Sequence, residues 1–204
     1  MMTSVLMAEL DGRGVSIDTS GAQIAAALVD RHDAFVFAGW AGLAALTLLA
    51  VFTARLAGVL SEGTSPPSWL GSLALLGGGL VMMVLVVDTG MVLAAQEAAE
   101  FRADPEAIKA IYAWSWNSAN LYAPGFGVMV LATTLVGRVD PRFPRWFVWY
   151  GTASMVAILG IALVAGAPGL AIVPALLWVI VCGVLLALRT SFVTGEAESR
   201  PDTG

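Results

Sequence analysis

Long uncharged apolar runs dominate the pattern of this chain and predict membrane-spanning helices. A run of roughly 20 apolar residues crosses a ~30 Å hydrocarbon core. We place the spans at about residues 35–53, 69–95, 121–136, 146–165 and 170–188. The last two share one uncharged run, which we divide at the turn signal Gly166-Ala167-Pro168-Gly169 because a single helix would be too long. The pattern predicts an all-α integral membrane bundle of five transmembrane helices.

Polar segments flank this transmembrane domain (residues 34–189) and predict short helices and tails. In the N-terminal segment 1–33, Ser20 is a helix cap for Gly21 to Asp30, an interfacial helix or an extension of the first span. Asp104-Pro105-Glu106 starts a second short helix, which we expect on the membrane surface before it bends into the third span near Pro124. The tail at 190–204 is polar, and we expect it to be disordered.

Composition supports the membrane assignment and excludes several function classes. Charged residues make up 12% of the chain, about half the ~25% of an average soluble domain. The single cysteine, Cys182, and the single histidine, His32, exclude an internal disulfide and a multi-histidine metal or haem site. The net charge of −5 and the single lysine, Lys109, leave no basic patch for nucleic acid. We therefore expect no cofactor, no metal and no nucleic-acid partner.

The distribution of arginine and lysine predicts orientation in the plasma membrane. Six basic residues follow the first, third and fifth spans, and four lie on the other side among many acids. Positive residues favour the cytoplasmic side, so we expect the N-terminus outside and the C-terminus inside. Arg138, Arg142 and Arg145 are also candidates for contact with anionic lipid, or they set orientation alone.

Asp88 is the one ionisable residue deep within a predicted span. A charge near the bilayer centre costs roughly 2.5–3.5 kcal/mol, so such residues usually face the bundle interior. Asn117 and Asn120 lie on a polar face of the third span at a similar depth, and with Tyr122 they predict an outward-facing ligand pocket around Asp88. Two alternatives stay open: the second span ends near Val87 and leaves Asp88 solvated, or these residues form a purely structural hydrogen bond.

Small residues recur on one face of two predicted spans. The stripes are Ala38, Gly42 and Ala45 in the first span and Ala153, Ala157 and Gly160 in the fourth. Such stripes allow close helix packing, within the chain, with a partner helix or in a homo-oligomer. We expect Trp40 and Trp178 to pack between helices and His32 to be solvated at the outer membrane edge.

Three segments carry a resemblance to a known family. They are Pro144-Arg145-Trp146 within residues 140–151, the triple glycine 77–79, and the acidic helix from Asp104 to Trp114. From Gln23 to Arg189 the chain resembles bacterial, mostly actinobacterial, multi-pass membrane proteins that share a domain of unknown function. The resemblance implies six spans, of which this chain lacks the first, and it implies no chemistry. A missing span would leave a groove for a partner helix or lipid.

Short loops and the lack of a nucleophile–base set favour a non-enzymatic accessory, assembly or regulatory protein. One alternative is a small-solute or lipid binder or transporter that uses the Asp88 pocket. The pattern speaks against it because no broken helix pair is evident. A further alternative is an intramembrane enzyme acting on lipid, in which Asp88 would be the only general base and would lack a catalytic partner.

Overall fold

The computed structural model describes residues 19–61, 67, 69–118, 121–140, 143–164 and 171–198. Within this part of the chain there are seven helices and no strand, which confirms the all-α fold class. The helices are α2 (Gly21–Asp30), α3 (His32–Ser61), α4 (Trp69–Glu100), α5 (Pro105–Ser118), α6 (Tyr122–Val139), α7 (Arg145–Val164) and α8 (Ile172–Glu198).

Four helices of the described chain, α3, α4, α6 and α7, are long and apolar enough to cross a membrane. They correspond to the first four predicted spans, so this is a membrane protein. The fifth predicted span corresponds to α8, whose apolar part, Ile172–Ala187, is shorter. The helix itself continues to Glu198, into the stretch predicted to be a polar tail. The predicted turn at Gly166 to Gly169 lies outside the described residues.

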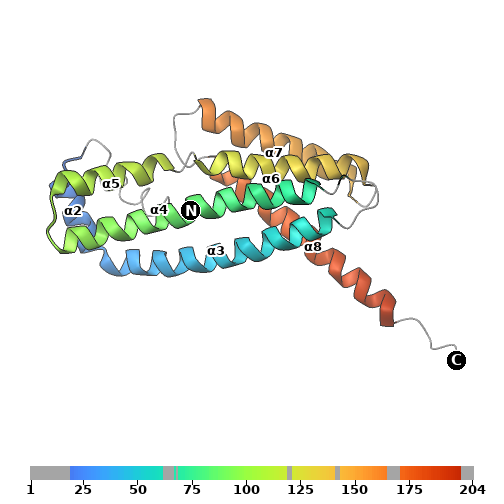
Figure 1. The fold of residues 1–204 in the computed structure, drawn as a ribbon, viewed down its shortest axis with the longest axis horizontal. Helices are drawn as coiled ribbons and strands as arrows, with labels where there is room; N and C mark the ends of the chain where they lie inside the picture. The colour runs from blue at the N-terminus through green and yellow to red at the C-terminus, as the bar shows by residue number, and fades with distance from the viewer. Residues whose placement is uncertain are drawn as a thin grey trace.

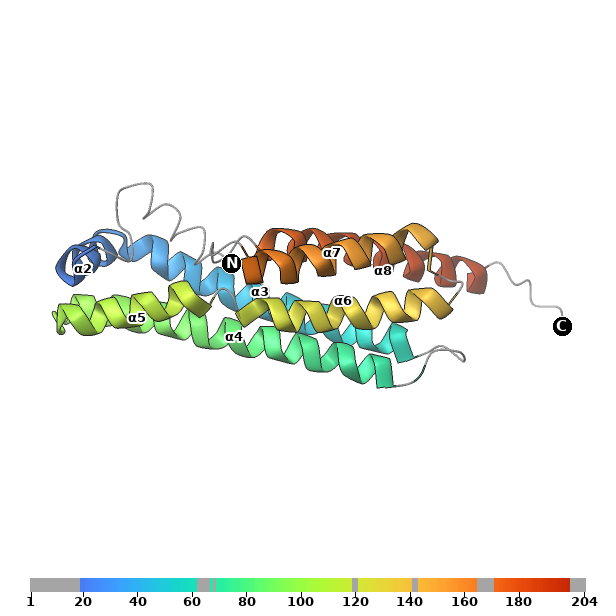
Figure 2. The same ribbon diagram turned by 90° about the horizontal axis from the view of Figure 1, so that it is seen from above.

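The long helices pack side by side as an elongated bundle (Figure 1). α3 and α4 form an antiparallel pair along the length of the molecule, and α6 lies between α4 and α7. α8 packs against α7 and α6 and also reaches α3, where the Trp178 ring meets the Phe52 ring edge-on at 6.2 Å. α2 and α5 cover one end of the α3–α4 pair (Figure 2).

Two separate hydrophobic cores follow from this arrangement. The larger core joins α6, α7 and α8 to α3 and α4, with Met129, Phe147 and Trp178 fully buried. The smaller core joins α2 and α5 to the opposite end of the α3–α4 pair, around Phe35 and Tyr112. By the predicted orientation the smaller core is at the outer end, so we call it the outer core and the larger one the inner core.

The two short helices begin where local chemistry predicts. Ser20 caps α2 by accepting a hydrogen bond from the backbone N–H of Gln23 at 3.4 Å. α2 is not an extension of α3, because the chain turns at Arg31 and α2 packs on α4 and α5. The Asp104 carboxylate accepts from the backbone N–H of Glu106 at 3.1 Å, as expected of the residue that opens α5.

One part of the prediction for α5 is wrong, namely that it bends into the third span near Pro124. α5 packs along α4, with Ile108 and Tyr112 buried, and is nearly in line with α6 (Figure 2). α5 ends at Ser118 and a new helix begins at Tyr122. Pro124 then falls in the first turn of α6, where a proline removes no helical hydrogen bond.

Glycines set the close approach of α4 to both of its neighbours. A Cβ on Gly77 would lie 2.7 Å from the Gly125 carbonyl oxygen of α6, and a Cβ on Gly78 would lie 2.2 Å from the Thr53 side chain of α3. A Cβ on Gly79 would meet nothing within 4 Å. The triple glycine therefore lets α4 pack tightly between α3 and α6.

Candidate functional site

Asp88 is buried in the middle of α4, with 3% of its surface exposed. The alternative of a solvated Asp88 is therefore wrong, and α4 does not end near Val87. The reason is that the apolar pattern resumes after Asp88: Val92 is buried in the outer core, and Leu93 remains on an apolar surface. The helix continues to Glu100 before it ends.

Two hydroxyl groups hold the Asp88 carboxylate. Ser118 Oγ donates to Asp88 Oδ1 at 2.8 Å, and Tyr122 OH donates to Asp88 Oδ2 at 3.3 Å. Ser118 is the last residue of α5 and Tyr122 is the first of α6, so the carboxylate bridges the break between these helices. Hydrogen bonds of this kind offset the cost of burying a charged group. We call these three residues the Asp88 cluster.

The predicted pocket and the Asp88 cluster overlap in part. Tyr122 meets Asp88 as predicted. Asn120 lies outside the described residues, and Asn117 belongs to α5 but its side chain is not described. The polar face predicted for one continuous helix is divided between α5 and α6. Sequence reasoning missed Ser118, although a hydroxyl directly after Asn117 was a signal available in the sequence.

The Asp88 cluster lies at the junction of the two cores. Val81 and Tyr122 belong to the inner core, whereas Val92 and Tyr112 belong to the outer core. In chemical terms the three residues offer one carboxylate, which is the candidate general base, and two hydroxyl groups. Within the described residues, no group of three or more His, Cys, Asp or Glu side chains is placed to hold a metal ion.

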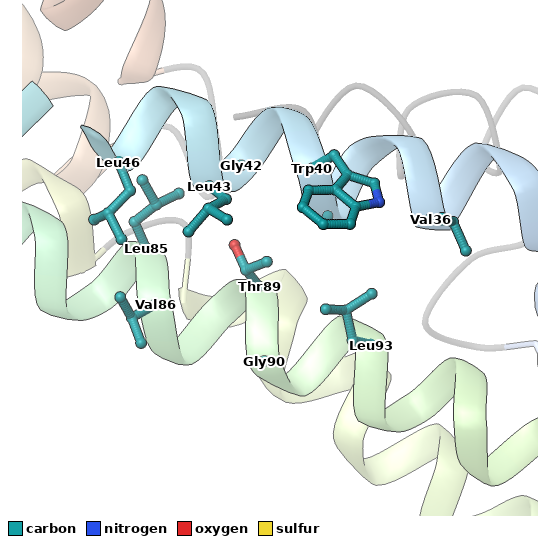
Figure 3. Close-up of a pocket in the computed structure, with 11 residues that line it drawn as sticks. Val36, Trp40, Gly42, Leu43, Leu46, Leu85, Val86, Thr89, Gly90 and Leu93 are labelled. Carbon is teal, nitrogen blue, oxygen red and sulfur yellow. The ribbon is translucent and has the colours of Figure 1, made fainter. Parts of the chain in front are cut away.

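A groove runs between α3 and α4, and its lining includes no residue of the Asp88 cluster (Figure 3). Its volume is about 440 Å³. We call it the α3–α4 groove. Its lining residues are Val36, Gly39, Trp40, Gly42, Leu43, Leu46, Leu85, Val86, Thr89, Gly90 and Leu93. The Thr89 hydroxyl points toward α3 across this groove, so the wall is apolar apart from this group and the Trp40 ring nitrogen.

The groove contains one residue that the sequence placed differently. Trp40 does not pack between helices: 69% of its surface is exposed, and its ring stands at the groove (Figure 3). Gly42, from the small-residue stripe of the first span, lines the groove as well. Trp178, in contrast, is fully buried as predicted. α3 lies at the edge of the bundle, because only 17% of its most apolar 18-residue stretch is buried inside the molecule.

No family model, curated protein or solved structure matches this chain. The family resemblance therefore stays a prediction, and the geometry of the described residues carries the functional argument. In that geometry the small-residue stripe of the fourth span is also open, since a Cβ on Gly160 would meet nothing within 4 Å.

The charged residues gather at the two ends of the bundle. Arg138 at the end of α6 and Arg145 at the start of α7 are exposed, and Arg142 between them lies outside the described residues. At the opposite end, His32 Nδ1 contacts the Glu100 carboxylate, and Gln96 Nε2 lies 2.7 Å from His32 Nδ1. His32 is half-exposed as expected, but it also joins α3 to α4.

Proposed function

We propose that this chain is a non-enzymatic accessory or assembly protein of the plasma membrane. In this proposal the α3–α4 groove binds a transmembrane helix of another polypeptide. The observation that carries it is the groove itself: an apolar channel on an edge helix whose lining no other part of the described ranges covers.

The glycines of the groove favour a helix as the occupant over a lipid chain. Gly90 on α4 leaves backbone open in the lining, since a Cβ there would meet nothing within 4 Å, whereas Gly39 and Gly42 on α3 face the Leu93 and Thr89 side chains of α4. Glycine at a helix surface lets a second backbone approach closely, which is how membrane helices gain contact without a hydrophobic driving force. A flexible acyl chain fills a groove of any shape and gains little from bare backbone. Trp40, Leu43 and Val86 then supply exposed apolar contacts for the partner.

The test is to fill the groove without disturbing the chain that forms it. A Cβ on Gly90 would meet nothing within 4 Å, so Gly90→Leu is accommodated and occupies the groove. Gly79→Leu is the matched control, because Gly79 is on the same helix and equally open but is not part of the groove. Both changes replace glycine by a strong helix former, so neither weakens α4.

The readout is native mass spectrometry of protein extracted gently from its own membrane. The proposal expects a second polypeptide with the wild type and with Gly79→Leu, and its loss with Gly90→Leu. A partner retained by Gly90→Leu contradicts the proposal. Loss of a bound lipid alone would identify an acyl chain as the occupant, and loss of a second copy of this chain would identify a homodimer.

The proposal includes an orientation. The N-terminus lies outside and the C-terminus in the cytoplasm, because the exposed Arg138 and Arg145 and the neighbouring Arg142 belong on the positive side. There they contact anionic lipid headgroups of the inner leaflet, and each contributes roughly 1 kcal/mol near a charged surface.

One observation favours a second candidate function, a small-solute binder or transporter. Discontinuous helices beside a buried polar residue line the binding sites of many transporters, and the α5–α6 break lies beside Asp88. The sequence showed no broken helix, and the described structure has this one break. Asp88→Asn separates the candidates: it should abolish solute binding in this second case and leave partner binding intact in the first.

A further inference from the structure

A cleft at the outer end of the molecule is separate from the Asp88 cluster and from the α3–α4 groove. It lies between α2 and the turn that joins α4 to α5, and its volume is about 620 Å³. Small apolar side chains such as Ala25, Ala99 and Ala103 form most of its wall. We call it the outer cleft.

The walls of the outer cleft are held firmly in place. A Cβ on Gly21 would lie 2.2 Å from the Pro105 carbonyl oxygen, so α2 and α5 meet backbone to backbone beside the cleft. Below it, Ile24 and Leu28 of α2 are buried in the outer core. The shape of the cleft is therefore built into the fold and does not depend on one surface side chain.

Two side chains of opposite charge, Asp30 and Arg102, line this cleft of alanines. Asp30 is the last residue of α2, and Arg102 belongs to the turn after α4, so they come from opposite walls. Neither side chain forms a salt bridge or hydrogen bond within the described part of the chain. Both charged groups are available to a ligand.

Arg102 occupies a backbone conformation that does not suit it. Its φ is 55°, the only positive φ of a non-glycine residue in the described ranges. The backbone N–H of Ala103 donates to the Ala98 carbonyl at 2.9 Å, which places Arg102 at the left-handed position that closes a helix. Glycine is preferred there because it has no side chain to clash.

Asp30 also occupies a position that disfavours its side chain. It is the last residue of α2, where the helix dipole is negative and disfavours an acidic side chain. Two residues that oppose local preference, from different elements and facing one cleft, are typical of a binding site, because such conflicts concentrate where function requires them.

We propose that the outer cleft binds a zwitterion. The anionic group of the ligand pairs with the Arg102 guanidinium, its ammonium pairs with the Asp30 carboxylate, and its aliphatic part contacts the alanine wall. A free aliphatic amino acid and the headgroup of an ethanolamine phospholipid both present this pair of charges. The site does not depend on the proposed partner helix, which binds at the α3–α4 groove.

The first test follows the thermal unfolding of the full chain in detergent as leucine is added. Two analogues each lack one charge: 4-methylpentanoate lacks the ammonium and 3-methylbutylamine lacks the carboxylate. Leucine should raise the midpoint in a concentration-dependent way, and each analogue should need at least tenfold higher concentration. A second arm compares nanodiscs that contain phosphatidylethanolamine with nanodiscs of phosphatidylcholine alone.

The variants separate binding from folding. Arg102→Gly should unfold at the same or a higher temperature than the wild type, since glycine suits the backbone, and yet lose the response to the ligand. Asp30→Asn should also lose the response. Asp33→Asn, an exposed acid outside the cleft, should keep it.

The results of these experiments support or overturn the zwitterion site as follows. A leucine response lost in Arg102→Gly and Asp30→Asn supports a free zwitterion, and stabilisation by phosphatidylethanolamine with the same losses supports a lipid headgroup. If neither probe stabilises the protein, or if both variants respond as the wild type does, the inference is overturned.

Discussion

At the scale of single residues, Asp88 shows how this chain keeps a carboxylate inside an apolar bundle. Its two oxygens accept hydrogen bonds from Ser118 and Tyr122, at 2.8 Å and 3.3 Å. The donors belong to different helices, so the side chain ties α5 and α6 to α4. Buried hydroxyl groups that lose their acceptor carry a desolvation cost with no compensating bond.

Asp88→Ala should therefore lower the free energy of unfolding by about 1–3 kcal/mol. Asp88→Asn should cost less, because the amide oxygen still accepts from one hydroxyl. The measurement is graded unfolding in mixed micelles. The control is Thr89→Ala. Thr89 follows Asp88 on α4, and its side chain makes no hydrogen bond in the described structure. Equal stability of Asp88→Ala and Thr89→Ala would contradict a structural role for the cluster.

The sequence left both a buried and a solvated Asp88 open, and the structure has the buried one, in contact with Tyr122 as the pocket hypothesis predicted. A charge inside a span must face inward and find donors. Ser118 was missed, because its place beside Asp88 depends on where α5 ends. Trp40 was placed wrongly because its exposure depends on which helices surround α3, and no pattern within α3 records that.

At the scale of elements, glycine positions decide which helix faces touch. Gly77 faces the α6 backbone and Gly79 faces open space, although they are two residues apart on α4. The start of α5 could be predicted from Asp104 and Pro105, because capping is local chemistry. Its course along α4 could not, because burial of Ile108 and Tyr112 is decided by tertiary packing.

Gly77→Ala should destabilise the bundle, and Gly79→Ala should not. The new methyl group at Gly77 would lie 2.7 Å from the Gly125 carbonyl oxygen and 2.9 Å from the Met129 nitrogen, so α4 and α6 must separate. Overpacking of this kind costs about 1–3 kcal/mol. Gly79→Ala should raise stability by up to about 1 kcal/mol through helix propensity. Identical unfolding curves for the two variants would show that the α4–α6 contact is looser than described.

At the scale of the whole molecule, the bundle is longer than a bilayer is thick. α4 contains 32 residues, a length of about 48 Å at 1.5 Å per residue, against a ~30 Å hydrocarbon core. Part of α4 therefore reaches beyond the hydrocarbon. We expect this to be the end that carries the outer core, because its acidic residues, including Glu97 and Glu100, suit water better than lipid.

Cysteine labelling tests this placement. In a Cys182→Ala background, Glu97→Cys should react with a membrane-impermeant maleimide in intact cells, because the proposed orientation places it beyond the outer membrane edge. Val139→Cys, at the end of α6 where the side chain is 52% exposed, should react only after permeabilisation. The reverse pattern would invert the orientation, and no labelling at Glu97→Cys in intact cells would place the outer core within the bilayer.

The central claim is that the α3–α4 groove holds a helix of another polypeptide, and photo-crosslinking in the native membrane tests it most directly. A photoreactive amino acid replaces Leu43, which lines the groove, or Leu48, which is on the same helix but outside it; both leucines are exposed, by 53% and 71%. The account predicts a discrete higher-mass polypeptide adduct from position 43 and none from position 48. Lipid adducts alone from both positions would contradict it.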